Sequence, residues 1–178
     1  GATSMGLLGS VYFYAYALMQ IPSGIMSDKF GPRRVVAVFT LVTAAGAILT
    51  GIATDFNMVI MGRLLIGIGA AAVYIPIMKM LSIWFRKNEF ATQSGMMLAV
   101  GNIGALSAAA PLAYLNTALG WQTVFTGLGV ASIALAILSY IVVRDKPSEM
   151  GFANIEDIEA HENGETVSAE AKPAENIS

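Results

Sequence analysis

Long apolar runs alternate with short polar turns along most of the chain. Five such runs cover residues 7–26, 35–53, 58–84, 91–115 and 123–143, and all but the third lack any charged residue. About twenty helical residues cross the roughly 30 Å hydrocarbon core of a bilayer, so each run is long enough to span it. The pattern therefore predicts five transmembrane segments.

The runs are expected to be helices, because a helix satisfies its own backbone N–H and C=O groups where no water is available. They show no period-two alternation of the kind that barrel strands have. They also lack the polar faces that helices of a soluble core would carry. We therefore predict an all-α membrane protein with a helical bundle over residues 1–146.

The composition agrees with lipid as the main solvent. Mean hydropathy is +0.66, with 56% hydrophobic and only 12% charged residues, which is far from the average of soluble domains. The chain has no cysteine, and its single histidine, His161, lies in a polar stretch. Thiolate metal sites and His-based triads are therefore excluded, and we expect no enzyme, metal, cofactor or nucleic-acid partner.

Basic residues are distributed unevenly among the loops. They follow the first, third and fifth runs, as Lys29, Arg33 and Arg34, then Arg86 and Lys87, then Arg144 and Lys146. The loops at 54–57 and 116–122 contain neither Lys nor Arg. The positive-inside rule places the basic loops in the cytoplasm. We expect a multi-pass protein of the plasma membrane, specifically the bacterial inner membrane.

The C-terminal tail differs from the rest. Residues 1–146 carry nine Lys and Arg against four Asp and Glu, a formal charge of +5, while residues 147–178 carry one against eight, or −7. The tail is rich in Glu, Ala, Ser and Asn and cannot bury enough apolar surface to fold alone. We predict a disordered, acidic cytoplasmic linker over residues 147–178. The chain opens at Gly1 with no initiator methionine, and its first ten residues do not have the pattern of a signal peptide, so we also expect it to be a fragment.

Small residues form smooth strips on several runs. Those of the fourth run are Gly101, Ala105, Ala109 and Ala113, with Gly104 and Ala108 beside them. Further clusters occupy residues 44–51 and 67–72. Such strips allow helices to approach closely, and we interpret them as packing faces.

Two cations lie within the third run. Arg63 is about five residues from its outer end, roughly 8 Å deep, and Tyr74 shares its face. Lys79 lies sixteen residues further on, about 160° around a straight helix, so the two cations cannot both point into one cavity. A charge at membrane depth is a candidate for a solute pathway. The alternative for each is snorkelling, in which a long stem carries the charge to the headgroups.

Uncharged polar residues provide further cavity candidates. Tyr12, Tyr16 and Gln20 lie four residues apart on one face of the first run, and Asn102 lies mid-depth in the fourth. Each can contact a solute or form a hydrogen bond between helices. Both interpretations stand for all four.

The turn after the first run, GIMSDKFGPRR at residues 24–34, concentrates charge. Asp28 would lie at the negative C-terminal end of a helix, unfavourable by about 0.3–1 kcal/mol unless a cation or another helix's N-terminus faces it. Gly31 and Pro32 turn the chain, and Arg33 and Arg34 can hold either the carboxylate or the lipid headgroups. We interpret the stretch as a conformational latch. Its assigned residues are Gly24, Asp28, Lys29, Gly31, Arg33 and Arg34.

Together these motifs resemble the major facilitator superfamily over roughly residues 1–151. GIMSDKFGPRR looks like that family's loop signature between its second and third spans, and RLLIGIGAA, from Arg63, resembles the pattern of its fourth span. GNIGALSAAAPLAYL and GWQTVF resemble the fifth span and the start of the sixth, and RDKPSEMG resembles the exit into the central loop. The resemblance implies a partial N-terminal six-helix bundle, spans two to six of twelve, without the first span and the C-terminal half.

The resemblance also implies a mechanism, in which two six-helix halves rock about a central site and expose it alternately to each side. Asp28 would engage a helix end in the other half when the inner gate is shut, supported by Lys29, Arg33 and Arg34. Arg63 would face the cavity. The implied partners are the lipid bilayer, a small-molecule solute and the missing parts of the same transporter, with the coupling ion, H⁺ or Na⁺, undetermined.

Two departures from the family pattern bear on function. Pro32 stands at a position that is often basic in the loop signature, so the charge network is thinner. The G-P-x-x-G-G pattern of many drug/proton antiporters is replaced by residues 108–111. We therefore favour uptake of a small organic solute, an anion suited to Arg63, over drug or metabolite efflux. A channel or a non-transporting membrane scaffold is the remaining alternative.

Overall fold

The computed structural model describes residues 2–155 and 158–159, and these residues contain helices and no strand. The helices are α1 (Ala2–Phe30), α2 (Pro32–Gly51), α3 (Phe56–Trp84), α4 (Lys87–Leu119), α5 (Trp121–Val142) and the short 3-10 helix η1 (Pro147–Met150). The five α-helices follow the five apolar runs in order, which confirms the all-α class. Most of them extend beyond their runs, because polar turn residues such as Lys29 and Lys87 continue the helix past the apolar segment.

Within the described residues, length and composition make α2, α3, α4 and α5 able to cross a membrane. α1 is 29 residues long but is more polar, since it carries three tyrosines, Gln20 and Asp28. It nevertheless displays apolar side chains outward, and Phe13, Leu18 and Ile21 are 68%, 75% and 77% exposed. Exposed apolar surface on this scale needs a cover other than water, as expected of a multi-pass membrane protein.

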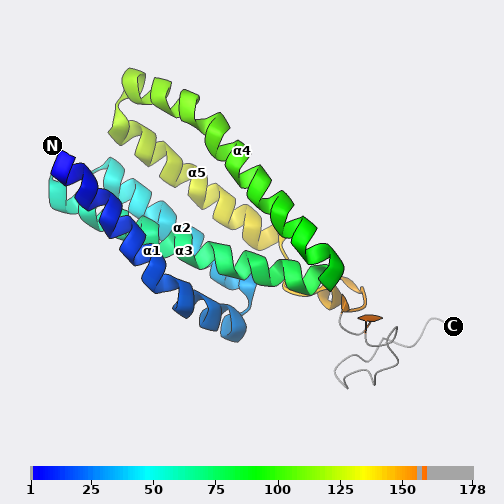
Figure 1. The fold of residues 1–178 in the computed structure, drawn as a ribbon. Coiled ribbons are helices and arrows are strands. Elements are labelled where there is room, and N and C mark those ends of the chain that lie inside the picture. The colour runs from blue at the N-terminus through cyan, green and yellow to red at the C-terminus, as the bar shows by residue number, and fades with distance from the viewer. Residues whose placement is uncertain (1, 156–157, 160–178) are drawn as a thin grey trace.

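α2 is the centre of the packed part. It lies between α3 and α5, and α3 in turn packs against α1 (Figure 1). A Cβ on Gly46 would lie 2.7 Å from the carbonyl oxygen of Gly62, and one on Gly67 would lie 2.6 Å from that of Tyr12. Such distances leave no room for a side chain, which confirms that the small residues at 44–51 and 67–72 are packing faces.

α4 is packed much more loosely. It has no buried residue, and it runs alongside α5 at a distance from α1 and α2 (Figure 1). A Cβ on Gly101 or Gly104 would meet no atom within 4 Å. Among the described residues no helix covers the small-residue strip of α4. The packing role of this strip therefore stays a prediction for the complete protein.

Two glycines make the tight turns. Gly31 alone joins α1 to α2, and Gly120 alone joins α4 to α5, with φ of 82° and 80°. Both positions lie in a region of backbone space that favours glycine. At the start of α3, Asp55 caps the helix by accepting a hydrogen bond from the Met58 N–H at 2.8 Å, as is typical of an aspartate N-cap.

The start of the tail returns to the bundle. After η1, the Glu159 carboxylate accepts a hydrogen bond of 3.2 Å from the Lys87 backbone N–H at the start of α4. The Lys87 ammonium lies 3.7 Å from the same carboxylate. The expectation of a disordered linker falls largely on residues 156–157 and 160–178, which lie outside the described residues.

Candidate gate and cavity residues

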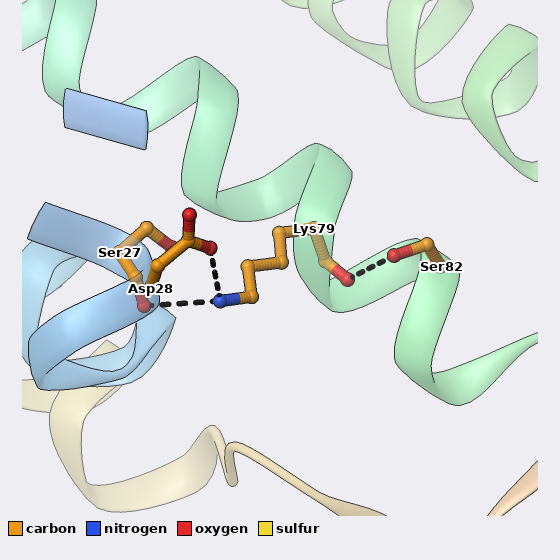
Figure 2. Close-up of polar contacts among 4 residues, drawn as sticks. All are labelled: Ser27, Asp28, Lys79 and Ser82. Atoms are coloured by element: carbon orange, nitrogen blue, oxygen red, sulfur yellow. Dashed lines mark hydrogen bonds and ion pairs between the residues drawn. The ribbon is translucent and has the colours of Figure 1, made fainter. Parts of the chain in front are cut away.

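Asp28 and Lys79 form an ion pair that joins α1 to α3. The Lys79 Nζ lies 2.6 Å from Asp28 Oδ1 and also donates to the carbonyl oxygen of Ser27 at 3.2 Å (Figure 2). The Lys79 backbone carbonyl accepts from the Ser82 hydroxyl at 2.8 Å (Figure 2). The ammonium therefore satisfies both a carboxylate and a carbonyl in the last turn of α1, where the helix dipole is negative.

Lys79 thus supplies the facing cation that the position of Asp28 called for. From the sequence alone the two residues look unrelated, because Asp28 belongs to the latch turn and Lys79 is a candidate for the cavity or the headgroup region. A usable signal was present, because consecutive spans alternate in direction. The end of α1 and the end of α3, two spans later, must therefore lie on the same side of the membrane.

The start of α2 is held by Asp145, which the sequence analysis did not single out. The Arg33 backbone N–H donates to Asp145 Oδ1 at 2.7 Å, and a Cβ on Gly31 would lie 2.8 Å from Asp145 Oδ2. The carboxylate lies against the N-terminal turn of α2, where the dipole favours negative charge. We call this contact between the Asp145 carboxylate and the Arg33 N–H the clasp. It connects the latch turn to the segment just after α5.

The Arg33 side chain reinforces this clasp. Its Nε donates to the Tyr140 carbonyl oxygen at 2.7 Å, and its guanidinium lies 4.3 Å from the Tyr140 ring centroid. A cation over an aromatic face is stabilised by the ring quadrupole. Arg33 therefore reaches α5, whereas the ion-pair partner of Asp28 among the described residues is Lys79.

The other latch candidates lie around this clasp. Lys29 is exposed and lies 5.4 Å from the Phe30 ring centroid, and Arg34 is exposed at the start of α2. A Cβ on Gly24 would meet the Ile75 side chain at 3.8 Å, an ordinary contact. Gly24 thus faces α3, but a larger residue would fit there at the level of the first carbon.

Arg63 lies near the N-terminal end of α3, and its guanidinium points toward α5. Its guanidinium carbon is 5.2 Å from the ring centroid of Phe125. Its Nε is buried and has no hydrogen-bond partner among the described residues. A buried guanidinium donor without a partner is costly, so this atom needs an acceptor that the described residues do not supply.

One tyrosine of α1 lies near Arg63. Tyr12 is within electrostatic reach of the guanidinium and stacks on Tyr16 with ring centroids 6.1 Å apart. Arg63 of α3 thus has aromatic neighbours on two helices, Tyr12 on α1 and Phe125 on α5. Tyr74, further along α3, is half-buried.

Gln20 and Asn102 are the remaining cavity candidates. The Gln20 carbonyl accepts from the buried Ser23 hydroxyl at 2.8 Å, and its side chain is half-buried. The Asn102 side-chain amide donates to the Leu98 carbonyl oxygen within α4 at 2.8 Å and is exposed. The structure therefore does not bring Asn102 next to Arg63.

An apolar cavity of about 250 Å³ lies at the opposite end of the bundle from Arg63. It is lined by the end of α3, the end of α5 and η1, and includes Trp84, Val143 and Met150. The Trp84 indole N–H donates to the Arg144 carbonyl oxygen at 3.3 Å. The residues described here form no group of three or more His, Cys, Asp or Glu side chains that could hold a metal ion.

Comparison with known proteins identifies the family. The family model described as "Major Facilitator Superfamily" matches residues 1–170. The chain is 28% identical over 147 residues to the "Probable sulfoacetate transporter SauU" of Cupriavidus necator, covering 83% of this chain and 34% of the relative. It is 30% identical over 145 residues to the "Probable L-galactonate transporter" of Escherichia coli K12, covering 82% and 32%.

A third relative has a different stated role. The "Quinolone resistance transporter" of Acinetobacter baumannii is 26% identical over 167 residues, covering 88% of this chain and 37% of the relative. The chain thus spans about a third of the length of the curated relatives it matches.

Proposed function

Because this chain belongs to the Major Facilitator Superfamily, we propose that the complete protein is a secondary transporter that takes up a small organic anion by alternating access. The chain would form five of the six helices of the N-terminal half. The first span and the C-terminal half would complete the solute cavity. The basic loops and the tail would face the cytoplasm, in a bacterial inner membrane.

The observation that supports this proposal most directly is the environment of the Arg63 side chain. A guanidinium that lies over an aromatic ring, with a buried donor that has no partner among the described residues, is suited to a carboxylate or sulfonate, which can accept from it. Two relatives are named as transporters of sulfoacetate and L-galactonate, both organic anions. Their names support the same solute class.

Asp28 and the clasp at Arg33 and Asp145 would form the inner gate. They lie at the basic end of the bundle, where the α1–α2 turn, the end of α3 and the segment after α5 meet. In the proposed mechanism the exposed Asp28 carboxylate engages a helix end of the other half when the inner gate shuts. Whether the driving ion is H⁺ or Na⁺ is left open.

Efflux of an aromatic drug is the second candidate. It is favoured by the relative named for quinolone resistance and by the aromatic neighbours of Arg63, Tyr12 and Phe125. A quinolone carries both a carboxylate and aromatic rings, so these residues could hold it. The two candidates differ in solute and direction but not in the use of Arg63.

Ligand-dependent thermal stability of the complete, purified protein tests the proposal. Sulfoacetate, galactonate and a quinolone would each be titrated against the native protein and Arg63→Gln. A ligand at one hundred times its Kd stabilises by about 2.7 kcal/mol. Loss of a charge-assisted hydrogen bond of about 1.5–3 kcal/mol weakens Kd by a factor of about ten to one hundred and fifty.

Two comparisons make the result specific. Lys87→Gln removes a cation that is 94% exposed and paired with the tail, so ligand stabilisation should be unchanged in this variant. Arg63→Lys keeps the charge but not the planar donor fork, and should recover only part of the effect. If every anion stabilised Arg63→Gln as well as the native protein, the proposed role of Arg63 would be wrong. If no solute stabilised any variant, a scaffold would be favoured.

A further inference from the structure

The pairing of Asp28 with Lys79 changes what closing the gate must involve. The Lys79 ammonium lies 2.6 Å from the carboxylate and 3.2 Å from the Ser27 carbonyl oxygen. The single Lys79 ammonium therefore offsets both the negative charge of Asp28 and the negative end of the α1 dipole. Any partner that arrives from the other half meets a carboxylate that is already neutralised.

The two side chains differ in exposure. Asp28 is 74% exposed, whereas Lys79 is 31% exposed and lies against α1. A carboxylate has about four lone-pair positions, so a donor from another element can approach the exposed side of Asp28 and compete with Lys79 for the carboxylate. The lysine is the fixed member of the pair and the carboxylate is the member that another element can reach.

We propose that Lys79 is the retaining partner of Asp28, which holds the carboxylate against α3 while the inner gate is open and competes with the other half for it. The inference rests on the proposed function, because it requires Asp28 to act as a latch. Closing the inner gate is then an exchange of partners. The ratio of closed to open gates depends on the difference between the two pairings and not on the latch contact alone.

Two other roles for Lys79 make different predictions. As a solute contact, Lys79 would have to share a cavity with Arg63, but the two lie about 160° apart around a straight α3. The Lys79 ammonium is also already paired with Asp28 of α1. As a simple tether between α1 and α3, Lys79 would affect unfolding and leave the gate ratio unchanged. Lys79 as proposed acts through Asp28, so it is a positioning residue.

The experiment measures the inner gate in the complete transporter. One spin label replaces the exposed Phe30, the last residue of α1, and one is placed on the inner end of the other half, and the distance distribution gives the closed-to-open ratio. Lys79→Gln should raise this ratio by a factor of about two to five, the range expected from an exposed ion pair. Asp28→Asn should lower it, and Lys79→Arg should restore the native ratio.

The double variant Asp28→Asn/Lys79→Gln provides the decisive comparison. Because Lys79 acts through Asp28, the double variant should match Asp28→Asn alone. Lys87→Gln is the matched control, since it removes a cation whose partner is Glu159, and it should leave the ratio unchanged. Lys79→Met keeps the apolar stem and replaces Lys79→Gln if the latter folds poorly, as judged from its unfolding midpoint.

The outcomes separate this inference from the proposed function. If Asp28→Asn lowers the closed fraction but Lys79→Gln and Lys79→Met leave it unchanged, the inference is overturned and the latch stands. If the lysine variants shift the ratio equally in the Asp28→Asn background, Lys79 does not act through Asp28 and the inference also fails. If Asp28→Asn has no effect, both the latch and the exchange of partners are wrong.

Discussion

Replacing Gly31 by alanine should destabilise the protein through the clasp between α2 and Asp145. Gly31 has φ 82° and ψ 145°, in a region essentially restricted to glycine, where another residue costs about 1–3 kcal/mol. The added Cβ would also lie 2.8 Å from Asp145 Oδ2 and 3.2 Å from Oδ1. The carboxylate would have to move away from the Arg33 N–H, which it now contacts at 2.7 Å.

The two effects give the expected magnitude. Loss of a helix N-terminal cap costs about 0.5–2 kcal/mol, so Gly31→Ala should lose about 1.5–5 kcal/mol when the backbone cost is included. Thermal or denaturant unfolding of the complete protein in detergent measures this loss. Asp145→Ala should lose the cap alone, and the double variant should lose less than the sum because the collision is relieved.

Gly127→Ala is the matched control. Gly127 lies within α5, and a Cβ there meets no atom within 4 Å, so this variant should be neutral or slightly more stable, as alanine favours helix. The reasoning would be refuted if Gly31→Ala were as stable as Gly127→Ala. It would also be refuted if Gly31→Ala and Asp145→Ala were strictly additive, because the clash between them would then be absent.

The remaining predictions concern packing and capping. Gly46→Val should unfold the bundle or lower its stability by more than about 3 kcal/mol, because a Cβ there lies 2.7 Å from the Gly62 carbonyl oxygen. In the same unfolding assay, Gly127→Val should retain the fold. Equal losses of stability in the two variants would contradict the packing account. Asp55→Ala should cost about 1 kcal/mol through loss of its bond to the Met58 N–H. Asp55→Asn should recover most of that loss, and an unchanged unfolding midpoint in Asp55→Ala would show that the cap contributes little.

Helix number and order could be predicted from the sequence because the bilayer requirement is strong and local. A run of about twenty apolar residues has few alternatives to helix in hydrocarbon, so five runs gave five helices. The boundaries were less accurate. α4 begins at Lys87 and ends at Leu119, beyond the run at 91–115, because helix propensity continues where hydropathy falls.

The pairing of site residues could not be predicted in the same way. The sequence indicated that Asp28 needed an opposing charge, but Lys79 is 51 positions away. Which residue of α3 lies opposite Asp28 depends on how α1 and α3 cross. Asp145 was hidden for a different reason. An aspartate after a span looks like an ordinary exposed loop charge, and only the three-dimensional approach of Gly31 and Arg33 shows that it caps α2.

The small-residue strips show where a local pattern stops being informative. Gly46 in α2 and Gly101 in α4 belong to similar strips, yet the first contacts a neighbouring helix backbone and the second meets nothing within 4 Å. A strip shows that close approach is permitted, but it does not identify the helix that approaches. For α2 the neighbours α3 and α5 belong to this chain. Any cover for the bare strip of α4 must come from beyond the described residues, consistent with a chain that spans about a third of its relatives.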